Sequence, residues 1–353
     1  MTMELAVPVV DIGLLMSLAS DADVHQHMDE LQPTVETLRQ AATEWGFFYI
    51  AHHGVTATEL QQFQTAMRAF FHLPKHVKAT IKRSANNSRG YFDDELTKNQ
   101  TDWKEGLDFA GEHENGPAEP VTPSGSPTRM LQDQNQWLDE DTLPAFKHEM
   151  MTYFARMEQV ARRLLMLFAL ALDQELTCFD QFFDHAHAAQ EDRNQDQRRT
   201  NASFLRLNYY PVAPQPESTM AVHHHTDAGA LTVLLQDDDV ASLQVLHRDT
   251  NQWVLIPPKP GTFVINIGDM LQVWSNDQFQ APLHRVLANG TRERFSAPFF
   301  YNPAYSSVVQ PLVVDAKPTY RPISWYDFRL QRFQGDYADV GEEIQISHFQ
   351  VAA

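Results

Sequence analysis

The sequence predicts an α+β protein with a double-stranded β-helix (jelly-roll) core, a mainly helical N-terminal extension and a C-terminal helix. After residue 202, short runs of β-branched and aromatic residues alternate with Pro, Gly, Asn and Asp, which is typical of a sandwich or barrel. Before that point apolar residues recur mostly with helical spacing, and they do so again over 323–335.

The length and composition favour one folded unit. A chain of 353 residues with 43% hydrophobic residues can bury one large core without dividing into two. We therefore expect three regions around that core: a mainly helical region over 1–200, the jelly roll over 201–310, and a helix and tail over 311–353 that pack on it.

The N-terminal region contains two stretches without useful periodicity. Residues 111–130 are rich in Gly and Pro, and residues 188–200 are strongly polar, so both are expected to be loops. The elements expected in this region are a strand at 8–12, a helix within 31–50 that leads into a second strand, a helix over 57–83 interrupted at Pro74, and a helix over 140–180.

The core region is expected to hold eight short strands, as a jelly roll requires. They are predicted at 203–210, 230–235, 242–247, 252–256, 262–266, 270–274, 283–288 and 294–301. The helix predicted over 323–335 ends at Gly335, a residue suited to a helix C-terminus.

Charge and cysteine content narrow the class of partner and the compartment. The chain has 46 acidic and 27 basic residues and a formal net charge of -19, which disfavours nucleic acid or an anionic membrane as partner. Cys178 is the only cysteine, so neither an intramolecular disulfide nor a thiolate metal cage is available. The N-terminus has no leader pattern and no stretch is long enough to span a bilayer, so a cytoplasmic protein is expected, and a monomer would suit it.

Three residues form a candidate metal site. His225 and Asp227 are two positions apart, so an extended backbone would point both side chains the same way. His284, in the strand predicted at 283–288, would supply a third ligand. Two imidazoles and one carboxylate on one face suit Fe(II) oxygenases, because the opposite face stays open, whereas a closed four-ligand zinc site has no open position.

This spacing alone is a weak signal in a chain with 16 histidines. His223 has the same strand parity as His225, although only His225 has a carboxylate two residues later. His185 and His187 form another pair, and their polar setting favours a solvated loop.

A second constellation suits a carboxylate ligand. Arg294 and Ser296 alternate on a predicted strand, and the planar guanidinium of Arg can donate two parallel hydrogen bonds to a carboxylate. A 2-oxo acid with a second carboxylate would satisfy both the metal and this Arg. The strand at 203–210 would place Asn208 and Tyr210 near such a co-substrate.

The same strand places Phe204 and Arg206 on that side, nearer the primary substrate. The alternative is that Arg206 pairs with a surface acid on an outward face. Both interpretations fit the alternation of this strand.

The chain resembles the isopenicillin N synthase-like group of 2-oxoglutarate/Fe(II) oxygenases over nearly its whole length. The matching motifs of the N-terminal part are 7–12, 44–55, 71–74, 89–91, 102–105 and 135–137. Those of the C-terminal part are 208–211, 214–217, 225–227, 230–237, 243–245, 266–269, 274–276, 283–286 and 292–296.

The resemblance implies roles for the candidate residues. His225, Asp227 and His284 correspond to the iron ligands, Arg294 and Ser296 to the residues that grip the distal carboxylate of 2-oxoglutarate, and Asn208 and Tyr210 to its supporting donors. The resemblance implies Fe(II) as the cofactor and 2-oxoglutarate and O2 as co-substrates. A small organic metabolite would be hydroxylated, desaturated or cyclised, with release of succinate and CO2.

The sequence departs from the group at positions that are expected to determine which substrate is bound. Ala241 and Ser242 replace the usual Gly-Gly, and Gly106 and Asp108 replace aromatic residues of the flavonoid-type members. The residues expected to contact the substrate are Phe204, Arg206, Asp108 and Phe300. Arg206 would meet a substrate carboxylate and Asp108 an amine or hydroxyl, which favours a small polar or amphiphilic acid over a flat flavonoid.

Two other functions fit parts of the pattern. A related oxidase that needs no 2-oxoglutarate also carries the Arg-x-Ser pair, although Asn208 and Tyr210 favour the 2-oxoglutarate user. A catalytically inactive jelly-roll binding protein would keep the fold without turnover, because a fold does not prove a function.

Overall fold

A computed structural model describes residues 6–84, 87–97, 100–111, 134–183, 201–236, 240–313, 317–335 and 343–351. The loops expected over 111–130 and 188–200 lie, apart from residue 111, outside the described residues, and so do His185 and His187.

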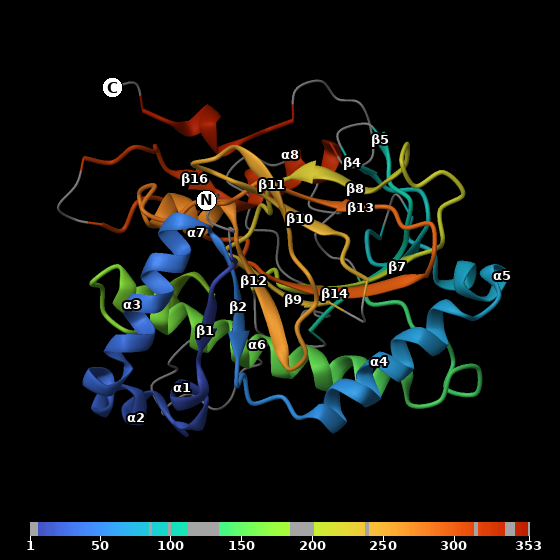
Figure 1. Ribbon diagram of the computed structural model, residues 1–353, viewed down its shortest axis with the longest axis horizontal. Coiled ribbons are helices and arrows are strands. Elements are labelled where there is room, and N and C mark those ends of the chain that lie inside the picture. The colour runs from blue at the N-terminus through green and yellow to red at the C-terminus, as the bar shows by residue number, and fades with distance from the viewer. Residues whose placement is uncertain are drawn as a thin grey trace.

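Two β-sheets form the core, and the smaller lies over the larger in Figure 1. The larger contains, in spatial order, β1 (Val9–Asp11), β2 (Phe47–Ala51), β12 (Thr262–Ile267), β9 (Leu231–Gln236), β14 (Arg294–Tyr301), β7 (Phe204–Tyr210), β6 (Glu105–Ala110) and β3 (Gly90–Phe92). The smaller contains β11 (Gln252–Leu255), β10 (Leu243–His247), β13 (His284–Leu287) and β8 (Met220–His225). The predicted jelly roll is confirmed.

Helices cover the outer face of the larger sheet (Figure 1). The long helix α6 (Phe146–Ala171) packs on β9 and β14, and both α3 (Met28–Glu44) and α4 (Ala57–Phe71) pack against α6. Their buried apolar side chains and those on one face of the sheet form one hydrophobic core. This core fixes the sheet from behind and leaves its other face to the interior of the roll.

The start of α4 shows how local sequence sets an element. Thr56 and Glu59 form a capping box: the Thr56 hydroxyl accepts from the Glu59 amide at 3.2 Å, and the Glu59 carboxylate accepts from the Thr56 amide at 2.8 Å. The interruption predicted at Pro74 is confirmed, because α4 ends at Phe71 and α5 starts after Pro74.

The remaining short elements are α1 (Gly13–Ser17), α2 (Asp21–Gln26), α5 (Lys75–Lys78), η1 (Ala79–Ile81), β4 (Leu96–Thr97), β5 (Gln100–Thr101), η4 (Asp180–Phe182), β15 (Val308–Val309), β16 (Ile323–Ser324) and η5 (Ile346–Phe349).

Two expectations for the core are corrected. The strand predicted at 270–274 is the helix α7 (Asp269–Trp274), and the strand β8 at 220–225 was missed. A mostly apolar run of only five residues does not distinguish a buried strand from a buried helix, and the His-rich β8 carries no apolar alternation. The number of strands in the described roll from β7 to β14 is still eight because the two errors cancel.

The N-terminal region contributes more than helices. Strands β1, β2, β3 and β6 all belong to the larger sheet, so the sheet crosses the boundary expected near residue 200. Strand β6 pairs with β7 in a register that sets Asp108 opposite Arg206. The C-terminal helix α8 (Trp325–Gly335) lies where it was predicted, and Gly335 is the last residue described before residue 343.

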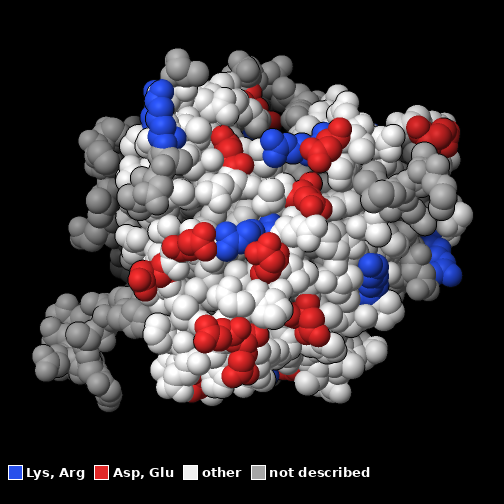
Figure 2. Space-filling model, turned by 60° about the vertical axis from the view of Figure 1, so that its left-hand side comes forward, with Lys and Arg blue, Asp and Glu red and all other residues white. Residues whose placement is uncertain are grey.

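The surface reflects the acidic composition. Figure 2 shows several groups of acidic side chains on one face, with fewer basic ones between them. Among the described residues, every helix is too short or too polar to cross a lipid bilayer.

Candidate metal and co-substrate site

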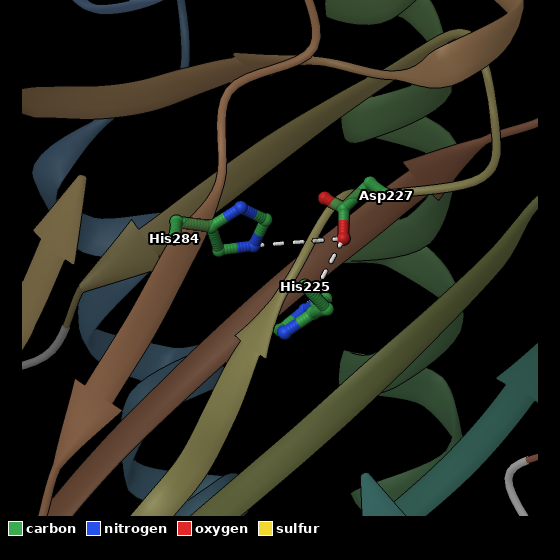
Figure 3. Close-up of side chains that lie close together, drawn as sticks. All are labelled: His225, Asp227 and His284. Atoms are coloured by element: carbon green, nitrogen blue, oxygen red, sulfur yellow. Dashed lines mark ion pairs between the residues drawn. The ribbon is translucent and has the colours of Figure 1, made fainter. Parts of the chain in front are cut away.

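His225, Asp227 and His284 converge at one end of the smaller sheet (Figure 3). His225 ends β8, His284 begins β13, and the antiparallel register sets these two residues opposite each other. The Nε2 atoms of both imidazoles lie 3.6 Å from Asp227 Oδ1. One potential ligand atom from each residue falls within 4.8 Å of the others, so the three side chains could hold a metal ion.

Backbone carbonyls orient both imidazoles. Nδ1 of His225 lies 2.8 Å from the His223 carbonyl oxygen, and Nδ1 of His284 lies 3.2 Å from the Pro282 carbonyl oxygen. Because a carbonyl oxygen can only accept, Nδ1 carries the proton in each ring. The Nε2 lone pairs are therefore directed to the common centre, as metal ligation requires.

Two neutral donors hold the carboxylate. Asp227 Oδ2 accepts from the Thr232 hydroxyl at 2.5 Å and from the Asn266 amide at 2.6 Å, which leaves Oδ1 facing the imidazoles. Burial alone would raise the pKa of Asp227, but the nearby His284 and His225 and the Thr232 hydrogen bond hold that pKa well below its usual range. Asp227 is therefore anionic, which is the form that metal ligation requires.

The two histidines differ in their proton affinity. Burial, together with the neighbouring His225, lowers the pKa of His284 to about 4, so this imidazole is neutral near pH 7. Burial also acts to lower the pKa of His225, but the interaction with Asp227 outweighs it and raises that pKa. A neutral imidazole is the form that binds a metal.

His223, the alternative first ligand, points elsewhere. Its Nδ1 lies 3.1 Å from Asp102 Oδ1, and its backbone amide donates to the same oxygen at 3.3 Å. Among the described residues, the cluster with metal-ligand geometry contains His225 and not His223.

The predicted carboxylate clamp is assembled from two paired strands. In the β14–β7 register Arg294 is opposite Tyr210, and Ser296 is opposite Asn208. The Ser296 hydroxyl lies 3.3 Å from the Tyr210 hydroxyl and 3.4 Å from the Asn208 amide nitrogen. These four side chains therefore form one group, as the alternation of the two strands predicted.

Part of the Arg294 guanidinium lacks hydrogen-bond acceptors. Its side chain is buried, with a residue exposure of 2%, and Nη2 donates to Gln236 Oε1 at 3.2 Å. Within the described part of the chain, Nε and Nη1 have no hydrogen-bond partner. A buried cation with unmet donors requires an anion, and a carboxylate offers two oxygens in the matching geometry.

The candidate clamp and the candidate metal ligands share one interior. Alternate residues of β9 face the same side, so Gln236, which contacts Arg294, is on the same face as Thr232, which contacts Asp227. Strand β9 thus connects the two halves of the site.

Comparisons with known proteins agree with this geometry. Residues 201–303 match the 2OG-Fe(II) oxygenase superfamily, and residues 7–140 match the family described as non-haem dioxygenase in morphine synthesis N-terminal. A homoarginine-6-hydroxylase of Glycine max is 34% identical over 320 residues, which cover 87% of this chain and 88% of that protein. This chain belongs to the 2OG-Fe(II) oxygenase superfamily.

Further relatives and solved structures extend the likeness. A homoarginine-6-hydroxylase of Oryza sativa subsp. japonica is 32% identical, with 87% of this chain and 88% of that protein covered. The crystal structure of JOX2 in complex with 2OG, Fe and JA has a TM-score of 0.69 and 26% identity, with 92% of this chain and 84% of that chain covered. The fold is also that of a Neurospora crassa protein whose structure was solved in complex with alpha-KG and thymine. The TM-score is 0.74 and the identity 22%, with 95% of this chain and 98% of that chain covered.

The protein is therefore an Fe(II)- and 2-oxoglutarate-dependent oxygenase that uses O2 and acts on a small organic molecule. This family assignment favours the 2-oxoglutarate-dependent enzyme over the two alternatives that the sequence left open. Two nitrogen donors and one carboxylate oxygen also suit Fe(II) chemically.

A cavity of about 120 Å³ adjoins His225 and Asp227 of the candidate metal site. Phe204 and Phe300 line it as a stacked pair, with ring centroids 4.6 Å apart, and the β14–β7 register sets them opposite each other. The other lining residues are Glu95, Leu96, Thr97, Lys104, Arg206, Val222, His225, Thr226, Asp227, Ala228, Gly229, Asn302, Trp325, Arg329, Arg332 and Glu343.

Arg206 is engaged by two carboxylates inside the protein. Its Nε and Nη2 each donate to Asp108 at 2.7 Å, and its Nη1 donates to Glu95 at 2.9 Å. Of the residues predicted to contact substrate, Phe204, Arg206 and Phe300 line the cavity, and Asp108 lies behind Arg206. The acids that pair with Arg206 are buried, so the surface pairing considered as the alternative is not what the structure contains.

Glu95 is the centre of this charged wall. Lys104 contacts Glu95 at 2.6 Å and Asp102 at 3.2 Å. Burial would raise the pKa of Glu95, but Arg206, Lys104 and Arg83 lower it far more. Glu95 lies in a stretch of sequence without a recognisable motif, and Lys104 belongs to the motif at 102–105, for which no role was predicted.

Gly106 does not widen the cavity. A Cβ at this position would lie 2.2 Å from the ring of Phe92, which is itself fully buried. The guanidinium carbons of Arg83 and Arg206 lie 4.0 and 4.9 Å from the centre of that ring. Phe92 therefore occupies the space beside Gly106 and supports the charged wall.

Proposed function

We propose that His225, Asp227 and His284 hold the iron and that Arg294 and Ser296 bind the distal carboxylate of 2-oxoglutarate. The observation that carries the proposal is the buried guanidinium of Arg294, whose unmet donors belong to the same interior as the three ligands. Asn208 and Tyr210 support this carboxylate site through Ser296.

The chain contributes positioning and exclusion of water. When bound, iron with 2-oxoglutarate and dioxygen supplies an oxidant for a substrate C–H bond, with succinate and CO2 as co-products. The three ligands occupy one face of the site and leave the opposite face for the co-substrate. Hydrogen bonds from Thr232 and Asn266 keep the ligating oxygen of Asp227 directed at the metal.

We further propose a small amphiphilic metabolite as the substrate. Its apolar part would lie on the stacked rings of Phe204 and Phe300, and its polar end would meet the wall of Glu95 and Arg206. Two relatives act on homoarginine, a small molecule with an apolar chain and charged ends, which supports this substrate class. Asp108 would act as a positioning residue, because it holds Arg206 through two hydrogen bonds.

An anaerobic titration tests the co-substrate site. Fe(II) and 2-oxoglutarate added to the protein should produce a weak visible charge-transfer band, and Asp227→Ala should abolish it. Absence of the band in the wild-type protein would contradict the proposed site.

The substrate proposal has its own test. Succinate release should be screened across small amphiphilic acids and amino acids. The double variant Arg206→Met/Asp108→Asn removes one charge of each sign, so it should raise the KM for the active substrate and leave the charge-transfer band in place. An unchanged KM would contradict the substrate role of this wall.

That the protein is a cytoplasmic monomer without nucleic-acid or membrane partners stays a prediction.

A further inference from the structure

We propose that Arg332 is a positioning residue that couples the C-terminal segment 343–351 to the metal-binding loop; this rests on the iron site proposed above. Arg332 lies on α8 and is buried, with a residue exposure of 5%. The two edges of its guanidinium contact two different parts of the protein, and both parts line the cavity.

The Nη2 edge contacts the metal-binding loop. Nη2 donates to the Thr226 carbonyl oxygen at 3.0 Å and lies 3.2 Å from the Thr226 hydroxyl. Thr226 is the residue between the two ligands His225 and Asp227. Since its carbonyl belongs to the peptide bond that enters Asp227, a contact that fixes this carbonyl limits how both ligands can turn.

Asp269 completes the support of this loop. Its backbone amide donates to the Asp227 carbonyl oxygen at 2.8 Å, and its carboxylate lies 3.4 Å from Nη2 of Arg332. The loop is therefore held on both sides of the peptide bond that joins Thr226 to Asp227. Because the Asp269 carboxylate is buried, removal of the Arg332 cation would leave that charge uncompensated.

The Nη1 edge contacts the C-terminal segment. Nη1 donates to the Ile344 carbonyl oxygen at 3.0 Å and lies 3.1 Å from Glu343 Oε1. Glu343 in turn lines the cavity next to the metal ligands. A guanidinium is planar and rigid, so displacement of one edge displaces the other. A lysine, with a single nitrogen, cannot span both parts.

The coupling predicts distinct effects of three variants. Arg332→Met should weaken Fe(II) binding by about 10- to 100-fold, the usual effect of losing a residue that supports metal ligands, and should raise the substrate KM. Arg332→Lys should recover part of the iron affinity through Thr226 without restoring the KM. Glu343→Gln should raise the KM and leave iron affinity within about twofold.

Arg321→Met is the matched control. Arg321 is exposed and donates to the His348 carbonyl oxygen at 3.0 Å, so it contacts the same C-terminal segment at a point away from the metal loop. This variant should keep both iron affinity and KM.

The measurements are anaerobic Fe(II) titration of the charge-transfer band at saturating 2-oxoglutarate, steady-state KM and kcat, and thermal unfolding. If folded Arg332→Met binds iron like the wild type, Arg332 has only a structural role and the coupling is wrong. If Arg332→Met does not fold, an unchanged iron affinity and KM in Arg332→Lys would equally overturn it. A wild-type protein that gives no band would instead contradict the iron site itself.

Discussion

His284 of β13 is directly opposite His225 of β8, and the two imidazole centroids are 4.3 Å apart. Residues so distant in the sequence meet because the antiparallel register of the smaller sheet brings them together. The register shifts just beyond His284, between it and Val286, so the two histidines lie beside an irregularity in the ladder. Irregularities of this kind are common next to active sites, where they direct a side chain.

The hydrogen bonds to Asp227 should control metal affinity. Thr232→Val keeps the shape of the side chain and removes the hydroxyl that donates to Oδ2. We expect Fe(II) affinity to fall by about 10- to 100-fold, measured by anaerobic titration. An unchanged affinity in the folded variant would show that the Asn266 donor alone orients the carboxylate.

Arg294 should determine the affinity for 2-oxoglutarate. Arg294→Met removes the buried guanidinium and its charge-assisted hydrogen bonds, so the KM for 2-oxoglutarate should rise by about tenfold or more. Arg294→Lys should recover only part of the loss, because one nitrogen cannot form the parallel pair.

Arg285→Met is the control for that experiment. Arg285 stacks on Trp253, with its guanidinium carbon 4.1 Å from the ring centre, and its Nε donates to Gln244. Loss of this cation should leave the KM for 2-oxoglutarate unchanged. Equal effects of the two substitutions would indicate that net charge, rather than the clamp, attracts the co-substrate.

His53 should make folding sensitive to acid. Burial lowers its pKa to about 4 from an ordinary value of 6.5, and its Nδ1 accepts from the Val55 amide at 3.2 Å, which requires an unprotonated nitrogen. Since the folded pKa is below the unfolded one, the unfolded chain binds more protons between pH 6.5 and 4. This stabilising contribution is complete above about pH 6.5 and is lost as the pH falls toward 4, by roughly 1 to 3 kcal/mol.

The variant His53→Asn keeps an acceptor near that position and cannot titrate. Urea unfolding of the metal-free protein from pH 7 to pH 4.5 should therefore show a smaller loss of stability in the variant than in the wild type. Equal losses would assign the acid sensitivity to other groups.

Gly106→Ala should destabilise the fold. The new Cβ would meet the buried ring of Phe92 at 2.2 Å, so the ring would have to move away from Arg83 and Arg206. We expect a loss of about 1 to 3 kcal/mol in the free energy of unfolding, as for other overpacked cores. Gly111→Ala is the control, because a Cβ there would make an ordinary 3.4 Å contact with Phe154. Similar losses in both variants would rule out the clash with Phe92 as the cause.

The sequence by itself determined the jelly roll, and it predicted the candidate metal ligands and the candidate clamp through alternation along short extended segments and through resemblance to a known family. The parity of β7 placed Asn208 and Tyr210 on one face, and the structure has both at Ser296. At 270–274 the segment was too short to show a period, and the predicted strand was wrong. In β8 the composition was polar, and the strand was not predicted.

Only the tertiary structure decided how separate segments combine. Asp108 was expected to meet the substrate, yet the β6–β7 register sets it against Arg206, and the charged wall adds Glu95 from a segment with no distinctive pattern. Arg332 reaches Thr226 from a helix more than a hundred residues away in the chain. Local periodicity specifies which way a side chain faces, whereas its partners are fixed by strand register and helix packing, which depend on the whole core at once.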